Sequence, residues 1–199
     1  MKVCIFRGTF NPIHTVHLAM AMFAKVKLQY DTVIFVPAYK PPYQDIDDEL
    51  ANHRYDMVKA AIEGNTSFQI SNIEFQNEKY SFPHEMVAEM SRRYAVEGKL
   101  GYIVGTDTFR EVDGWWEAEK VKNAVHFIVF PRSNKFNPEN YNRFVEWGYD
   151  FEFADMKFMD VSSKVIRHRV KTGKPLGGLV TQPVLEYIRK NGLYLPYNE

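Results

Sequence analysis

The sequence predicts an α/β fold, a doubly wound and mostly parallel sheet with a C-terminal helical part from about residue 160. Four apolar runs lack clean alternation, which is typical of strands buried on both faces of a parallel sheet. Helix-like segments separate these runs, and strand–helix repeats with right-handed crossovers build such a sheet. The 199 residues suit one domain, and because no linker composition interrupts them we expect a single domain spanning residues 1–199.

The expected strands and helices follow from local patterns along the chain. The four apolar runs are residues 3–6, 32–36, 100–104 and 125–130. Helices are expected at 17–27, 51–63 and 84–94, and irregular structure, as loops or short helices, at 39–50 and 133–149. In the first helix, four-residue spacing predicts that Leu18, Met22 and Val26 face the core. In the third, Met86, Val87 and Met90 are expected to face inward.

Beyond Asp160 the pattern predicts two more helices. Ser162 or Ser163 can cap a helix that runs to about Lys171, with Gly173 just past its end. Thr181 can cap a second helix, which Asn191 and Gly192 would close.

The amino-acid composition limits the kinds of binding partner and the cellular compartment that we expect for this protein. Lysine plus arginine and aspartate plus glutamate both number 25, so no bulk charge indicates nucleic acid or an acidic membrane. The single cysteine, Cys4, lies in the first apolar run and is expected to be a buried thiol in a reducing compartment. No run approaches the ~18 apolar residues of a membrane helix. We expect a cytoplasmic protein without a nucleic-acid or membrane partner, and leave a homo-oligomer open.

The segment RGTFNPIHTVH, residues 7–17, lies where the first strand ends and a helix begins. Gly8 permits a tight turn and close approach of a ligand to the backbone. A helix start offers free N–H groups and a positive dipole end, which together bind anions. His14 and His17 flank that point, and each can donate a hydrogen bond to a phosphate oxygen or carry positive charge. Alone, the pattern fits a helix cap without chemistry equally well, whereas zinc lacks further ligands nearby.

A second segment, VSSKVIR at 161–167, offers another helix start with two serines. Arg167 lies one turn beyond Ser163 on the same face and can form two bonds to phosphate oxygens. A capped surface helix would explain this segment by itself. Two separate helix starts, each with side chains suited to phosphate, favour a phosphate site.

Both segments resemble known signatures. GTFNPIHTVH is similar to the N-terminal signature G-x-F-[DN]-P-x-H-x-G-H of the nucleotidylyltransferase superfamily, and VSSKVIR is similar to its C-terminal signature I-S-S-T-x-I-R. Within it the chain most resembles the bacterial nicotinate mononucleotide adenylyltransferase family, nearly end to end, through PAYKPPY, HRYDM, YIVGTDTF and EYIRKNGLY. Departures from the family pattern are Arg7 and Val16 for glycines, Gln44 for lysine, Lys164 for threonine, and the segment YSFPHE.

The resemblance implies a single nucleotidylyltransferase domain with a Rossmann-like sheet. The reaction would join ATP and nicotinate mononucleotide into nicotinate adenine dinucleotide, with release of pyrophosphate, in NAD biosynthesis. The acceptor phosphate would attack the α-phosphorus of ATP in line, without a protein nucleophile. Mg²⁺ would bridge the nucleotide phosphates, so no dedicated protein ligands for the metal are expected.

The resemblance also implies roles for individual residues. His14 and His17 would be catalytic, the second as a donor to the α-phosphate. Contacts to ATP would come from Gly8, Thr9, Phe10, Gly105, Asp107, Ser162, Ser163 and Arg167. Contacts to nicotinate mononucleotide would come from Ser81, Trp115 and Arg132. From the residues alone, Asp107 could equally cap a helix and Trp115 could simply pack.

Two other readings of the function remain open from the sequence. One is a different transferase of the superfamily, with nicotinamide mononucleotide or phosphopantetheine as acceptor. The other is a nucleotide-binding regulator that keeps the fold without turnover. Acceptor-dependent release of pyrophosphate separates the three.

Overall fold

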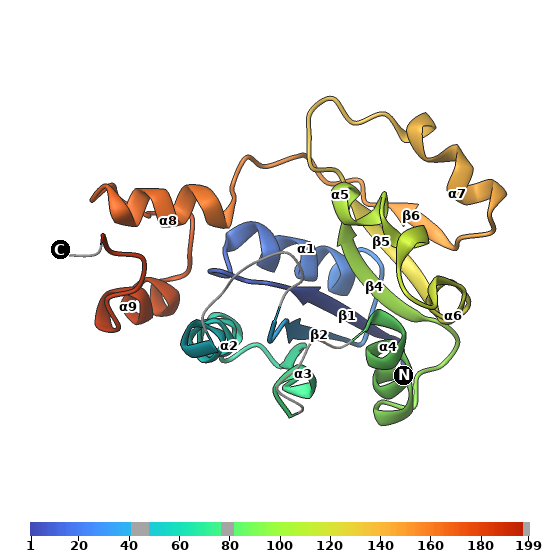
Figure 1. Cartoon of the computed structure of the whole chain (residues 1–199), viewed down its shortest axis with the longest axis horizontal. Helices are drawn as coiled ribbons and strands as arrows, with labels where there is room; N and C mark the ends of the chain where they lie inside the picture. The colour runs from blue at the N-terminus through green and yellow to red at the C-terminus, as the bar shows by residue number, and fades with distance from the viewer. Residues whose placement is uncertain (41–47, 77–81, 197–199) are drawn as a thin grey trace.

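The computed structural model describes residues 1–40, 48–76 and 82–196, and it places one sheet between two layers of helices (Figure 1). Six parallel strands are ordered β3-β2-β1-β4-β5-β6. Their bounds are β1 Val3–Gly8, β2 Thr32–Pro37, β3 Phe68–Ile70, β4 Leu100–Gly105, β5 Val125–Phe130 and β6 Phe151–Phe153. The doubly wound α/β prediction is therefore confirmed, with the strand order reversing between β1 and β4.

The helices occupy the segments between and after the strands. They are α1 Thr15–Val26, α2 Asp48–Ile62, α3 Ile73–Gln76, α4 Pro83–Arg93, α5 Thr106–Phe109, α6 Ala118–Ala124, α7 Asn142–Glu146, α8 Ser163–Lys171 and α9 Gln182–Lys190. Two 3₁₀ turns, η1 Val112–Gly114 and η2 Pro138–Tyr141, complete the pattern. The segment expected to be irregular at 133–149 contains the short helices η2 and α7.

Two hydrophobic cores lie on opposite faces of the sheet, because successive residues of each strand point to opposite sides. On β1, Cys4 and Phe6 join the core under α1, α2, α8 and α9. Val3 and Ile5 join the core under α3 to α7. Burial on both faces explains why the central strands are continuous apolar runs. It also confirms that Cys4 is buried.

The inward face of α1 differs from the expectation. Leu18 packs against the core as expected, but Met22 is 41% exposed and Val26 60% exposed. The buried residues are Val16, His17, Met20, Ala21 and Ala24. A spacing of four drifts by ~40° per step around a helix of 3.6 residues per turn, so residues 18, 22 and 26 rotate progressively away from the sheet. The inward face expected for α4 is confirmed, since Met86, Val87 and Met90 are buried.

Several short elements were absent from the prediction. Edge strands β3 and β6 have three residues each, and neither carries an apolar run long enough to stand out. Helices α3, α5 and α6 have four to seven residues, which is too short for a periodic signal. Helix α2 begins three residues before residue 51, within the segment expected to be irregular.

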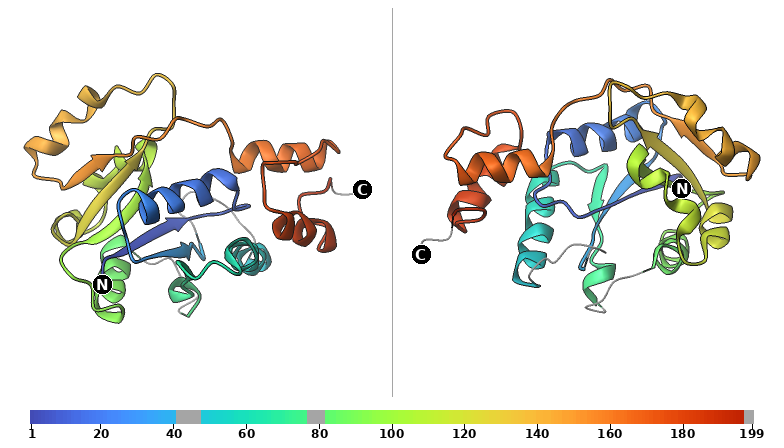
Figure 2. Two further views of the ribbon diagram at one scale, coloured as in Figure 1. Left: turned by 180° about the vertical axis from the view of Figure 1, so that it is seen from behind. Right: turned by 45° about the horizontal axis from the view of Figure 1, so that its top comes forward.

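The two C-terminal helices pack against the first half of the chain, at one end of the molecule (Figure 2). Ser162 is the N-cap of α8 and accepts the Val165 N–H at 3.3 Å, while Gly173 beyond the helix has φ +66°. Thr181 occupies the N-cap of α9, although its side chain makes no capping bond. The backbone N–H of Thr15 donates to Leu179 O at 3.0 Å, which ties α1 to the segment before α9. Across the described ranges, no helix has the length and apolar character of a membrane span.

Candidate active site

A cleft of about 1580 Å³ opens beyond the carboxyl ends of β1 and β4. Ligands of open α/β sheets bind at this switch point of strand order. Three segments far apart in sequence meet there: the turn after β1, the end of β4 and the start of α8. Its lining includes Gly8, Thr9, Phe10, His14, His17, Gly105, Trp115, Arg132, Ser162, Ser163 and Arg167. The two signature segments therefore do share one cavity.

The turn after β1 folds over the ring of Phe10. Phe10 has φ +48°, a left-handed conformation uncommon for residues other than glycine, and its side chain is buried. A Cβ on Gly8 would lie 2.9 Å from that ring. Glycine is thus required at position 8 because the Phe10 ring occupies the space a side chain would need.

His14 and His17 lie side by side at the start of α1. Their ring centroids are 3.6 Å apart in a stacked arrangement, and both side chains are almost fully buried. The backbone N–H of His14 donates to His17 Nδ1 at 3.2 Å, so the proton of a neutral His17 ring is on Nε2. His14 Nδ1 is buried and has no hydrogen-bond partner within the described part of the chain. His14 is also the N-cap residue, so the capping and cleft-lining readings both apply to it.

Both histidines are neutral at pH 7. Burial, with a contribution from the charge of Arg132, lowers the pKa of His14 from 6.5 to about 4. Burial also holds the pKa of His17 well below 6.5, and the charges of His14 and Arg132 act in the same direction. The histidines therefore offer N–H donors and carry no positive charge, contrary to one possibility that the sequence left open. The positive charge of the cleft comes from arginine and lysine side chains.

Arg132 reaches the cleft across the end of β4. Its backbone N–H donates to Thr106 Oγ1 at 3.1 Å. A Cβ added to Gly105 would lie 2.5 Å from Arg132 Nε, so the absence of a side chain at 105 gives the arginine its path. Gly105 was predicted to contact ATP and Arg132 to contact nicotinate mononucleotide. The two residues are nevertheless in direct structural dependence, because the Arg132 side chain occupies the space beside Gly105.

Helix α8 is docked on the turn that leads to the histidines. Ser163 Oγ donates to Pro12 O at 2.8 Å, and Arg167 Nη1 donates to Asn11 O at 2.7 Å. The Ser163 hydroxyl proton is therefore used within the protein, whereas Arg167 keeps four of its five donors for a ligand. Tyr194 supports the same turn, because its hydroxyl donates to Asn11 Oδ1 at 2.7 Å.

The remaining predicted residues differ in whether they line the cleft. Asp107 is exposed in the first turn of α5 and is not part of the cleft lining, and Gly105 rather than Asp107 is the N-cap. Trp115 lies on Tyr102, with ring centroids 5.9 Å apart, and also borders the cleft. Ser81 lies outside the described residues, as does Gln44. Val16, which replaces a glycine, points into the hydrophobic core and leaves the cleft clear.

Arg54, part of the family-like segment HRYDM, was assigned no role from the sequence, and it is fully buried. Its guanidinium donates to Thr9 O at 2.7 Å, to Ala38 O at 2.6 Å and to Tyr39 O at 2.9 Å. It therefore joins the loops that follow β1 and β2. Burial lowers the pKa of Arg54 to about 10, which leaves it charged at neutral pH. An arginine in the middle of a helix has no local pattern that separates it from a surface residue.

Glu74 is a second buried charge that the sequence did not reveal. Its side chain is inaccessible to solvent and accepts from Arg7 Nε at 2.6 Å and from the backbone N–H of Tyr39 at 3.1 Å. Arg7, which replaces a glycine of the family pattern, is thus paired with the negatively charged side chain of Glu74 at the end of β1. Removing one member would leave the other buried without its partner.

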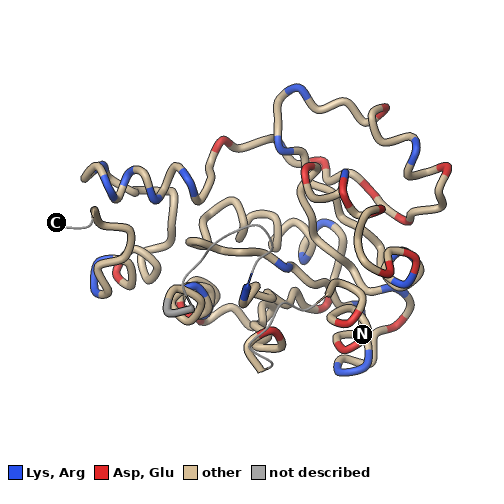
Figure 3. Tube along the Cα trace, viewed as in Figure 1, with Lys and Arg blue, Asp and Glu red and all other residues tan. Residues whose placement is uncertain are grey.

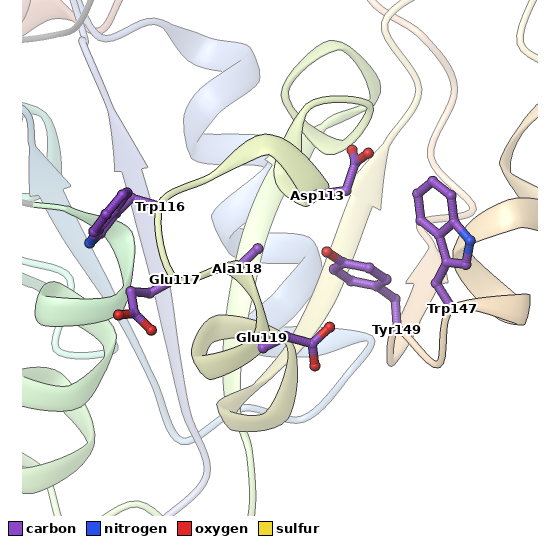
Figure 4. Close-up of a pocket in the computed structure, with 7 residues that line it drawn as sticks. All are labelled: Asp113, Trp116, Glu117, Ala118, Glu119, Trp147 and Tyr149. Carbon is purple, nitrogen blue, oxygen red and sulfur yellow. The ribbon is translucent and has the colours of Figure 1, made fainter.

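A second pocket of about 460 Å³ lies over η1 and α6, where aromatic side chains alternate with acids (Figure 4). Each acid already has a basic neighbour: Asp113 with Arg143 at 3.8 Å, Glu117 with Lys120 at 3.1 Å and Glu119 with Lys122 at 2.8 Å. These are surface ion pairs, and the pocket holds none of the predicted site residues. The predicted site residues that line a pocket all lie in the larger cleft.

Comparisons with known proteins identify the family of the chain. A model of the cytidylyltransferase-like family matches residues 5–169. The nicotinate-nucleotide adenylyltransferase of Bacillus subtilis is 34% identical over 194 residues, covering 97% of this chain and 98% of the relative. A protein of Caldicellulosiruptor saccharolyticus named "Probable nicotinate-nucleotide adenylyltransferase" is 37% identical over 199 residues, covering 98% and 99%.

Solved structures show the same fold. The nicotinic acid mononucleotide adenylyltransferase of Plasmodium falciparum, complexed with NaAD, superposes with a TM-score of 0.79 at 15% identity, covering 97% of both chains. The full-length matches in sequence and the matching fold agree with the two signatures that meet in one cleft. The chain belongs to the nicotinate-nucleotide adenylyltransferase family, within the cytidylyltransferase-like proteins.

Proposed function

We propose that this chain transfers the adenylyl group of ATP to nicotinate mononucleotide, giving nicotinate adenine dinucleotide and pyrophosphate. The observation that carries the proposal is the meeting of the two buried, neutral histidines with the start of α8 in one cleft. An oxygen of the acceptor phosphate forms a bond to the α-phosphorus, and the bond from that phosphorus to the bridging oxygen of pyrophosphate breaks. No protein nucleophile takes part.

The described residues divide this work between them. His17 Nε2 carries the ring proton and donates to the α-phosphate as negative charge accumulates there. His14 donates to the neighbouring phosphates. The backbone of Gly8, Thr9 and Phe10 lies along the nucleotide, and Ser162, Ser163 and Arg167 hold its β- and γ-phosphates.

The opposite end of the cleft takes the acceptor. Arg132 binds the phosphate of the mononucleotide, and Trp115 offers an aromatic face to the electron-poor pyridine ring. Ser81 binds the carboxylate of the acceptor in this proposal, whereas Asp107 accepts from a ribose hydroxyl of ATP. Asp107 lies in the first turn of α5, between Gly105 and Thr108, which both line the cleft.

A magnesium ion fits this site as a companion of the nucleotide. Within the described ranges no three histidine, cysteine or acidic side chains gather into a metal site. Mg²⁺ retains several waters and is commonly held through substrate phosphates. When bound, it would supply charge neutralisation on the triphosphate, while Arg167 does so from the protein side. The protein is proposed to act in the cytoplasm.

The direct test is pyrophosphate release from ATP and Mg²⁺, with nicotinate mononucleotide, nicotinamide mononucleotide and phosphopantetheine as separate acceptors. The expected result is turnover with nicotinate mononucleotide and a clear preference for it over the amide. Preference for another acceptor would reassign the substrate. Binding of ATP without turnover on any acceptor would contradict the enzymatic function and favour a nucleotide-binding regulator.

A further inference from the structure

Lys164 stands at an electrostatically unfavourable place. It is the second residue of α8, in the first turn of a helix whose N-terminal end carries the positive pole of the dipole. That turn contains no acidic residue. Basic residues stabilise a helix at its other end, so selection for stability alone does not explain a lysine here. Residues that violate such local preferences for stability are found most often at functional sites.

The side chain of Lys164 is exposed and lines the cleft. Among the described residues it has no ion pair and no side-chain hydrogen bond, whereas Arg7, also in the cleft lining, is paired with Glu74. Arg167 lies three positions further along α8, on the same face, and also lines the cleft. Lys164 and Arg167 therefore face one ligand from the same helix.

A second observation indicates that this ligand is an anion bound between α8 and α1. His14 Nδ1 is buried without a hydrogen-bond partner among the described residues, in the same cleft, and the ring of His14 is only 2% exposed. Burial lowers the pKa of both histidines, so their rings supply donors rather than positive charge. The acidic residues of the lining, Glu111 and Asp113, lie at the Trp115 end. Lys164 and Arg167 place two positive charges at α8, in addition to that of Arg132, which acts on both histidines.

We propose that Lys164 binds the terminal phosphates of ATP and the departing pyrophosphate, together with Arg167. Its ammonium supplies positive charge, which the threonine usual at this position in the family cannot. This inference rests on the proposed function for its substrate, although the binding step is independent of any acceptor.

The alternative is a generally basic helix that attracts anions without a specific contact. Figure 3 shows basic positions along the length of α8. Lys171, the last residue of α8, provides the matched control, because it lies outside the cleft lining and at the end where a cation is favourable. Replacing either lysine removes the same charge from the same helix.

The experiment compares Lys164→Thr and Lys171→Thr by calorimetric titration of the intact protein with Mg²⁺–ATP, Mg²⁺–pyrophosphate and AMP. Lys164→Thr is expected to weaken the binding of ATP and pyrophosphate roughly tenfold, as for loss of one charge-assisted bond, and to leave AMP unchanged. Lys171→Thr is expected to keep all three affinities within about twofold, a difference below the value of one such bond.

Thermal unfolding without ligand gives an independent readout. Lys164→Thr is expected to keep or raise the melting temperature, because it removes a cation from the positive end of the helix dipole, and Lys171→Thr to lower it slightly. Equal weakening of ATP binding by the two variants, or wild-type ATP and pyrophosphate affinity in Lys164→Thr, would overturn the proposal. Absence of turnover on every acceptor would refute the proposed function and leave these binding results valid.

Discussion

At the scale of single residues, the proposed chemistry depends on keeping His14 and His17 unprotonated. Two stacked imidazolium rings at a centroid distance of 3.6 Å would repel each other, and burial removes the water that would stabilise either charge. Neutral rings can donate to a phosphate without first losing a counter-ion. As a consequence, protonation of these histidines at low pH destabilises the folded protein.

This sensitivity gives a prediction for stability. The folded protein holds His14 at a pKa of about 4, against 6.5 when unfolded, so the unfolded state binds more protons between these values. The stability contributed by His14 is fully present above about pH 6.5 and is lost as the pH falls toward 4. The expected loss is on the order of 3 kcal/mol. Urea unfolding from pH 7 to 4 checks it, with His14→Gln/His17→Gln expected to show a weaker pH dependence than the wild type. Identical slopes would refute the assignment.

His17 gives a prediction for rate. Replacing it with alanine removes the Nε2 donor to the α-phosphate, so His17→Ala should lower kcat by ~10²–10³ with a smaller change in KM for ATP. His168→Ala is the control, because His168 is exposed and lies outside the cleft lining. Steady-state release of pyrophosphate measures both. Full activity in His17→Ala, with the fold verified by circular dichroism, would exclude its proposed role.

At the scale of elements, the cleft is shaped by contacts that join loops to helices. Arg54 of α2 joins the loops after β1 and β2, and Ser163 and Arg167 of α8 hold the turn at Asn11 and Pro12. Tyr194 adds a contact from beyond α9. Each of these bonds ends on a carbonyl or side chain of a loop that borders the cleft. The loops therefore owe their positions to distant helices.

Arg54 makes this dependence testable. A lysine in its place has one ammonium group, which cannot span the three carbonyls that the guanidinium now reaches. Arg54→Lys should lower the free energy of unfolding by about 1–3 kcal/mol and weaken ATP binding, because buried carbonyls of the loops lose their donors. Denaturant unfolding and calorimetric titration with ATP measure the two effects. Arg189→Lys, on the exposed end of α9, should match the wild type in both, and a wild-type result for Arg54→Lys would contradict the argument.

At the scale of the whole molecule, the C-terminal helices share a core with the sheet. Ile166 of α8 and Val184 and Ile188 of α9 belong to the same cluster as Cys4 and Phe6 of β1. We propose on this basis that residues 1–199 unfold as one unit. The cleft then needs no assembly of separate domains.

Fluorescence and circular dichroism can test this proposal separately. All three tryptophans, Trp115, Trp116 and Trp147, lie in the part of the chain between β4 and β6, whereas α8 and α9 contribute only to circular dichroism. In a urea titration the two signals are expected to give the same midpoint. An early circular-dichroism transition without a change in fluorescence would show that the helical part unfolds independently.

The sequence by itself determined the features that are local. Central strands bury both faces and therefore appear as apolar runs, and helix ends carry caps and glycines, so the four central strands and the helices α8 and α9 could be predicted. The two signatures also located the candidate cleft from residues alone, since carboxyl ends of neighbouring parallel strands share one edge.

Only the tertiary structure decided the features that depend on distant contacts. The edge strands β3 and β6 exist because longer neighbours pair with them, and the inward face of α1 is set by how closely its alanines approach the sheet. The neutrality of the histidines comes from burial under Phe6 and Phe10 and from the charge of Arg132, more than a hundred residues away. A pKa or a buried arginine depends on three-dimensional surroundings, and no local pattern encodes these surroundings.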